Sequence, residues 1–245
     1  MREVETRWTL LDQMLEGGTI GDGSHQPAWD WFCDKYRDLI LTLLRRRLTA
    51  SLAAEAVDDF WSYLYEHDLV SRADRSRGFR PFLCGIIARY AMAWSRNRRK
   101  LLDAPLPEFG EGDEKAEIGL PSDEPDPAEL VSEQDEQLYS EHVLRMAIDA
   151  YAKEKPNAAK ALCLAHGWDL TTKSFEAGPV LKGPEIAEKL ATNANNVHVM
   201  LHRARKRVKE LVELELRQTI GSIDQLEGEV ARVEEHTRFG AVLPS

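Results

Sequence analysis

Apolar residues recur at helical spacing through two long blocks of this chain, and both blocks contain long stretches without glycine or proline. Steps of three and four residues place these side chains on one face of a helix. No run alternates apolar and polar positions with β-branched residues, which is the pattern of a half-buried strand. The sequence therefore predicts an all-α protein built from two small helical domains.

The first block predicts three helices, over residues 28–48, 52–66 and 81–98. Pro81 falls in the first turn of the third helix, where a missing backbone N–H does no harm. Each helix has one apolar stripe that we expect to be buried. The stripe residues are Trp29, Phe32, Tyr36, Leu39, Ile40 and Leu43, then Val57, Phe60, Trp61 and Leu64, then Leu83, Ile86, Ile87, Tyr90 and Trp94.

The second block predicts two helices separated at Pro156, an irregular stretch over 169–183, and a final pair of helices joined by a turn around 191–194. The small Ala187 falls where the two helices of that pair must approach closely. Such a pair is typical of a helix-turn-helix, whose second helix enters the major groove of DNA. The buried stripes of the pair are Ile186, Ala187 and Leu190, then Val197, Leu201, Ala204, Val208 and Leu211.

Charge is distributed very unevenly along the 245 residues, whose net charge is −10. Residues 101–141 carry 14 acids and one base, with five prolines, whereas 27–100 and 142–216 are net basic by 5 and 3 charges. The acidic stretch predicts a flexible linker, extended by self-repulsion and by its prolines. The expected organisation is an extension over 1–26, a first domain over 27–100, the linker over 101–141, a second domain over 142–216 and a helical tail over 217–245.

Several classes are excluded by what the sequence lacks. No apolar run approaches the roughly 20 residues that cross a bilayer, and the N-terminus does not resemble a signal peptide. Three widely separated cysteines favour a reducing cytoplasm and neither a disulfide framework nor a Cys-rich zinc site. No phosphate-binding glycine loop, metal-spaced cluster or nucleophile–base pair is present, so we expect neither an enzyme nor a cofactor nor a metal.

Two further patterns favour nucleic acid. The last helix combines residue types that read bases, Asn and His, with later residues that bind phosphate, Arg and Lys. The first block ends in WSRNRRK, residues 94–100, and interleaves arginines with aromatic rings that can stack on unpaired bases. A solvated basic face and simple core packing are the alternatives for these two patterns. A third cluster, Glu55, Asp58 and Asp59, suits a protein-binding face or plain solvation better than catalysis.

The order of these motifs resembles bacterial RNA polymerase sigma factors of the sigma-70 family, extracytoplasmic-function type. AAEAVDDFWSYL resembles the helix that binds core polymerase, RSRGFRPFLCGIIARYAMAWSRNRRK resembles the helix that follows it, and NNVHVMLHRARKRVKELVELELRQTI resembles the end of the promoter-reading domain. The opening TRWTLLDQML and the tail after Leu216 are similar to a planctomycete-rich subgroup. Ala56, Asp58, Tyr90 and residues 193–196 depart from the family pattern, which leaves the promoter sequence unpredicted.

The resemblance implies a transcription initiation factor with no catalytic residues, acting in the cytoplasm on duplex and melted promoter DNA and on core RNA polymerase, through the β′ clamp helices and the β flap. An anti-sigma factor is a further partner that the resemblance allows. It implies core-polymerase binding by Glu55, Asp58, Asp59, Phe60 and Trp61. It implies −10 DNA binding by Arg77, Arg80, Arg89, Tyr90, Trp94, Arg96, Arg98 and Arg99. It implies −35 DNA binding by Asn195, Asn196, His198, His202, Arg203, Arg205 and Lys206.

Two other functions remain open from the residues themselves. A one-component helix-turn-helix transcription regulator explains residues 183–212 equally well, but not the basic aromatic block or the acidic stretch. A protein-only helical adaptor would use the acidic helix and the tail. In that tail, Ile223, Leu226, Val230 and Val233 follow a coiled-coil spacing for only about two heptads, so we expect it to dock back onto the body.

Overall fold

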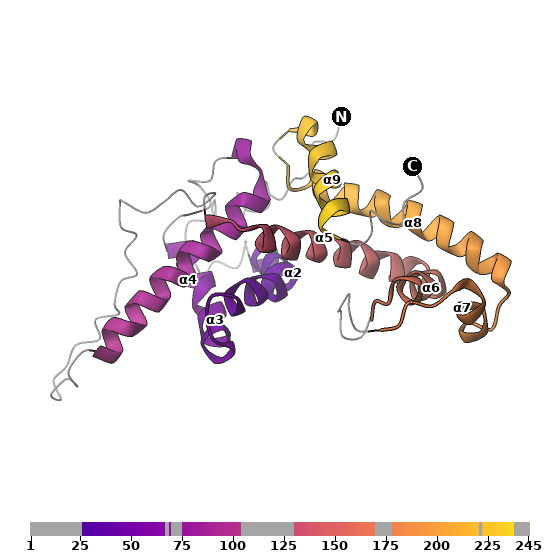
Figure 1. Ribbon diagram of the computed structural model, residues 1–245. Helices are drawn as coiled ribbons and strands as arrows, with labels where there is room; N and C mark the ends of the chain where they lie inside the picture. Colours follow the sequence, from indigo (N-terminus) through magenta and orange to yellow (C-terminus); the bar gives the residue numbers. More distant parts are fainter. Residues whose placement is uncertain are drawn as a thin grey trace. The chain divides into compact units, whose positions relative to one another are not determined.

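The computed structural model describes residues 26–66, 69, 75–103, 130–169, 178–220 and 222–237. These residues form α-helices, two short 3₁₀ turns and no β-strand, which confirms the all-α prediction (Figure 1). The helices are α2 (Gln26–Arg45), α3 (Ala50–Glu66), α4 (Phe79–Asp103), α5 (Glu133–Glu154), α6 (Pro156–His166), α7 (Gly183–Lys189), α8 (Ala194–Arg217) and α9 (Leu226–His236). No described helix combines the length and the apolar composition that crossing a bilayer requires.

The chain divides into two compact units, Met1–Leu138 and Tyr139–Ser245, so the boundary falls inside α5. This corrects the expected linker over 101–141. Residues 101–103 complete α4, and residues 133–141 belong to α5, where the first turn packs on the first unit. Between these two helices only residues 130–132 are described, and the extension over 1–25 lies outside the described residues.

The first unit is a packed set of α2, α3 and α4. Its core is rich in aromatic rings that contact one another, with centroids 5.0 Å apart for Phe32 and Tyr36, 5.3 Å for Tyr36 and Phe79, and 5.2 Å for Phe60 and Tyr90. Each such pair contributes about 0.5–1.5 kcal/mol beyond the burial of its area. The predicted apolar stripes therefore form most of this core, whereas Trp61 is half-buried and the side chain of Trp29 lies outside the described residues.

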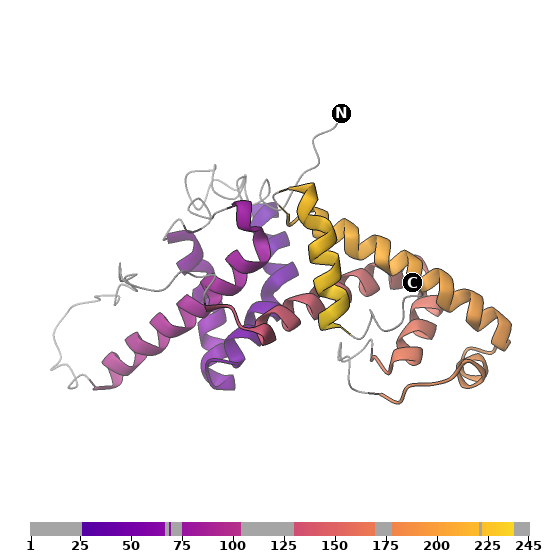
Figure 2. The same cartoon turned by 45° about the horizontal axis from the view of Figure 1, so that its top comes forward.

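The second unit is organised around α8, which contacts α6, α7 and α9. Ala161 of α6, Ile186 and Ala187 of α7, and Val197 of α8 form a buried cluster, as the small residue at position 187 predicts. Helix α6 begins at Pro156, where a helix start was expected. Figure 2 shows α9 beside the C-terminal half of α8, with Val233 buried, so the tail docks onto the body as predicted.

Candidate nucleic-acid interface

The N-terminal half of α8 presents one polar and basic face to solvent. Val197, Ala204 and Val208 bury the opposite face of the helix. Successive residues of a helix turn by about 100°, so every third or fourth residue returns to the exposed side. The exposed side chains of this half, among those predicted to bind DNA, are Asn195, Asn196, His198, His202, Arg203 and Lys206. The chain contains no Asp or Glu between Lys189 and Lys209, so no carboxylate from this segment neutralises the basic side chains of the face.

A short turn holds α7 against the start of α8. Helix α7 ends with Leu190 as its C-cap, and the N–H of Thr192 donates to the carbonyl of Ala187 at 2.9 Å. Ala191 adopts the left-handed conformation, with φ of 49°, which an L-residue other than glycine rarely does. The turn lies where the sequence predicts it, and its hydrogen bond reaches back into the buried part of α7.

Asn196 has a local structural role in this turn. Asn193 caps α8, and its side-chain oxygen accepts the N–H of Asn196 at 2.8 Å. The amide group of Asn196 itself donates to the hydroxyl of Thr192 at 3.2 Å. The side chain of Asn196 is exposed and bonded to this turn, and its assignment to base reading stays a prediction.

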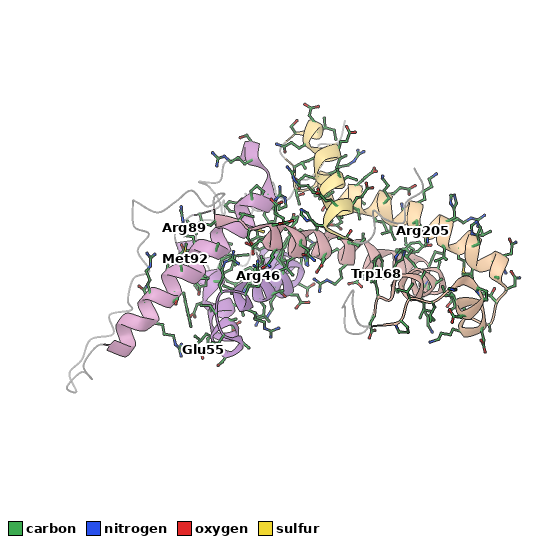
Figure 3. The ribbon with its side chains drawn as sticks, viewed as in Figure 1. Arg46, Glu55, Arg89, Met92, Trp168 and Arg205 are labelled. Carbon is green, nitrogen blue, oxygen red and sulfur yellow. The ribbon has the colours of Figure 1, made fainter. Side chains whose placement is uncertain are left out.

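Arg205 lies on the flank of α8 that meets the end of α6. Figure 3 shows it on the side toward Trp168, on which the ring of His166 stacks with centroids 4.5 Å apart. Burial and the charge of Arg205 lower the pKa of His166 to about 4, and burial also lowers the pKa of Arg205. Two nitrogen atoms here are buried without a hydrogen-bond partner, Nε of Arg205 and Nε2 of His166. Arg205 is therefore half-buried beside His166, and its assignment to a DNA phosphate stays a prediction.

The basic run of α8 ends in an ion pair with the tail. Nζ of Lys209 donates to the Glu234 carboxylate of α9 at 2.8 Å. Two residues before it, Arg207 makes two hydrogen bonds to Glu154 of α5, at 3.0 and 2.8 Å. These pairs limit the open cationic face of α8 to its N-terminal half.

Helix α4 carries the other predicted DNA-binding residues, and two of its rings are in the core. Tyr90 is 0% exposed, and its hydroxyl donates to the carbonyl of Ala56 at 2.9 Å. Burial, with the nearby Asp59 carboxylate, raises the pKa of Tyr90. Trp94 is also buried, and its Nε1 donates to Asp59 at 3.4 Å. Both rings therefore lie in the core between α4 and α3, and contact with unstacked bases stays a prediction that this packing does not support.

The exposed side of α4 is basic. Arg89, Met92 and Arg96 follow at three- and four-residue steps and so share one face, and Figure 3 shows Arg89 and Met92 together on the helix. Arg96 is exposed and Arg89 half-buried, and Met92 is one of the exposed large apolar side chains. From Phe79 to Leu102 the chain contains six bases and no acid. This face is the counterpart in the first unit of the α8 face.

The remaining predicted arginines of this region have different surroundings. Arg80 is buried and pairs with Glu136 of α5, so it does not meet solvent as a phosphate contact would. Arg98 pairs with Glu55 of α3 at 2.5 Å and stacks its guanidinium 5.2 Å from the centre of the Trp94 ring. Arg77 is exposed in a 3₁₀ turn, and the side chain of Arg99 lies outside the described residues.

The predicted polymerase-binding helix α3 exposes its carboxylates but not Phe60. Asp58 is exposed and pairs with Arg37 of α2 at 2.8 Å, whereas Phe60 is 0% exposed. Trp61 is half-buried, with its ring 5.8 Å from that of Phe32. Phe60 is thus a core residue and cannot contact a partner, which corrects its assignment. Glu55, Asp58 and Asp59 form the acidic edge of α3.

Sequence reasoning missed one strongly built cluster, at the start of α5. Asp135 is 0% exposed and accepts hydrogen bonds from Arg46 at 2.5 Å and from both terminal nitrogens of Arg47, at 3.0 and 2.6 Å. Its carboxylate also accepts the N–H and hydroxyl of Ser132, at 2.9 and 2.8 Å. The motif Ser-x-x-Asp, in which the two residues cap each other, was the available signal.

The charge of Asp135 is held by these partners. Burial alone would raise the pKa of this carboxyl, but the hydrogen bonds from Arg47 and Ser132 outweigh it and lower the pKa below its ordinary value. Together with the Arg80–Glu136 pair, this cluster fixes the first turn of α5 on α2 and α4. We call Arg46, Arg47, Ser132 and Asp135 the α5 clasp.

The described residues contain no group of three His, Cys, Asp or Glu side chains that could hold a metal ion. Burial raises the pKa of the Cys33 thiol to about 11 and of the Cys84 and Cys163 thiols to about 12, so none is a thiolate nucleophile at neutral pH.

The geometry thus leaves three solvent-facing surfaces of defined charge. Two are basic, on the N-terminal half of α8 and along Arg89, Met92 and Arg96 of α4, and one is acidic, on α3. Each is held by a buried apolar face of the same helix. Comparison with protein-family models, with curated proteins and with solved structures finds no match to this chain.

Proposed function

We propose that this chain is a sigma-type subunit that binds core RNA polymerase and directs promoter recognition, −10 opening and transcription initiation. The observation that carries the proposal is the face of α8 that begins at Asn195, which is exposed, basic and without an acid as far as Lys209. Helix α7 supports it across a short turn, as the first helix of a helix-turn-helix supports a recognition helix.

Residues on this face of α8 are assigned either to base reading or to phosphate binding by their position along the helix. Asn195 and His198 lie in the first turns, which in a helix-turn-helix meet base edges. Lys206 follows two turns later and suits a backbone phosphate. Because Asn196 is hydrogen-bonded to Thr192, we assign base reading first to Asn195 and His198.

The first unit supports the remaining steps of the proposed function. The basic face of α4 suits the phosphates of a melted strand, and the acidic edge of α3 suits a basic surface such as the polymerase clamp. A one-component regulator would need only the α7–α8 pair and gives no role to these two surfaces. The proposal therefore uses features in both units.

The test is transcription with purified core polymerase. The full chain should co-purify with core polymerase in stoichiometric amount and should direct run-off transcription from a subset of a genomic fragment library. Binding to duplex DNA without any association with core polymerase would support the one-component regulator instead. Association with proteins, and no salt-dependent affinity for DNA even in complex with core polymerase, would support the adaptor.

A further inference from the structure

One side chain on the exposed face of α8 does not match its polar surroundings. Val199 is 38% exposed, although it lies in the middle of the face formed by polar and basic residues. Asn195 precedes it by four residues, and His202 and Arg203 follow it by three and four, so these four residues are neighbours on the helix surface. The buried Val197 lies two residues away, on the opposite side of the helix.

The packing of the helix does not explain a valine at this position. An exposed β-branched residue is a poorer helix former than alanine, because its χ1 freedom is lost against the preceding turn. The contacts that bury α8 are made through Val197, Ala204 and Val208 on the other side. A valine at position 199 therefore contributes little to the fold that alanine would not, and its apolar surface is available to a partner.

The surroundings of Val199 define the chemistry of that partner. The segment between Lys189 and Lys209 has no acid, so its face suits a polyanionic partner, and Val199 offers that partner an apolar contact. In the major groove of duplex DNA the C5-methyl of thymine is the apolar group that base pairs present. Uracil and cytosine lack that methyl group, so a contact to it distinguishes a T·A pair.

We propose that Val199 contacts the C5-methyl group of a thymine in the major groove and gives this protein a preference for a T·A pair at one position of its duplex site. The inference rests on the proposed function, because it requires α8 to enter the groove. It adds a specificity-determining residue next to Asn195 and His202.

The test pairs an isosteric substitution in the protein with the removal of one methyl group from the DNA. Duplex sequences are first selected from a random library by the complex of the full chain with core polymerase. Each thymine of the selected site is then replaced singly by deoxyuridine, and equilibrium affinity is measured for the wild type and for Val199→Thr, which keeps the shape and replaces a methyl by a hydroxyl. Val180→Thr, the same substitution at another exposed valine of this unit, is the matched control.

One thymine-to-uracil replacement should weaken wild-type binding by about 4-fold, the change expected for losing one methyl-sized contact. The same replacement should change the affinity of Val199→Thr less than 2-fold, while Val180→Thr should keep the wild-type response. If transcription is intact, two results would overturn this inference alone. One is the same change of affinity in wild type and Val199→Thr at every thymine, and the other is a selected site without thymine. Failure to select any sequence or to direct transcription would overturn both this inference and the proposed function.

Discussion

The guanidinium of Arg47 donates to both carboxylate oxygens of Asp135, at 3.0 and 2.6 Å, across 88 positions of sequence. The carboxylate is completely buried and the guanidinium is mostly buried. Two parallel bonds of this kind fix the orientation of both groups as well as their distance. The first turn of α5 is therefore attached to the helical core of the first unit by a geometrically specific pair.

Removing this carboxylate should cost the first unit much of its stability. Asp135→Ala leaves Arg46 and Arg47 without their shared partner in a largely dry site, and we expect a loss of about 3 kcal/mol, at the low end for a broken buried ion pair because both arginines keep some contact with water. Urea unfolding measures it. Glu133→Gln removes an exposed charge from the same turn and should cost less than about 1 kcal/mol. Equal losses in the two variants would contradict a structural role of the clasp.

The stability of the second unit should depend on pH through His166. The pKa of this imidazole is about 4 in the folded chain and 6.5 in the unfolded one. Between these values the unfolded chain binds a proton that the folded chain does not, so stability falls as the pH is lowered from 6.5 toward 4. The slope is at most about 1.4 kcal/mol per pH unit, and smaller because part of the ring meets water.

His166→Phe, which keeps a ring to stack on Trp168, should flatten this part of the curve. Thermal unfolding at a series of pH values provides the measurement. A slope that is the same in wild type and variant would show that other groups cause it.

Two substitutions on α8 should separate base reading from phosphate binding. Asn195→Ala should cost about 1–3 kcal/mol at one position of the selected site and relax the preference there. Lys206→Ala should weaken binding to all sequences alike and lower the salt slope by about one unit. Affinity for a panel of single-base variants, measured at several salt concentrations, distinguishes them. If both variants gave the same sequence-independent loss, α8 would bind only the backbone.

The ion pair between Lys209 and Glu234 should restrain DNA binding. Glu234→Gln releases the charge of Lys209 at the end of the basic run, so affinity for duplex DNA should rise about 2- to 5-fold, the range that corresponds to a surface ion pair. Glu235→Gln removes the same charge from the next, exposed residue and is the control for overall charge. Identical increases in both variants would mean that net charge, and not this pair, sets the effect.

The acidic edge of α3 can be tested without disturbing its folding by exchanging a pair. Arg37→Asp combined with Asp58→Arg keeps the 2.8 Å ion pair possible but reverses the charge that α3 presents. We expect normal thermal stability and at least a tenfold loss of affinity for core polymerase, which corresponds to about 1.4 kcal/mol. Asp59 is less suitable, because it accepts a hydrogen bond from Trp94. Unchanged binding of the exchanged variant would remove Asp58 from the polymerase-binding surface.

Periodic features of the sequence predicted the fold well. The apolar stripes of α2, α3 and α4, the helix start at Pro156 and the turn before Asn193 follow from local spacing and capping, which depend on neighbouring residues alone. The stripe of α4 also included Tyr90 and Trp94, and both rings are buried as their spacing predicts. Such features can be predicted from the sequence because each depends on the residues of a single helix and its ends.

What the sequence could not predict depends on contacts between distant segments. The pairing of Asp135 with Arg46 and Arg47 requires knowing which surface receives α5. The half-burial of the Arg205 side chain depends on where α6 ends, at His166. The hydrogen bond from Asn196 to Thr192 was unpredicted for a different reason, since an amide at the start of a helix can bond either to the preceding turn or to a ligand.

Because of the clasp, both ends of the acidic segment are attached to the same folded unit. Its preceding helix α4 and the first turn of α5 both belong to the first unit, so residues 104–132 join two points of one folded body. The cost of closing such a loop grows only with the logarithm of its length, about 0.6 kcal/mol for each doubling. The position of the first turn of α5 therefore depends on the clasp far more than on the length of chain that precedes it.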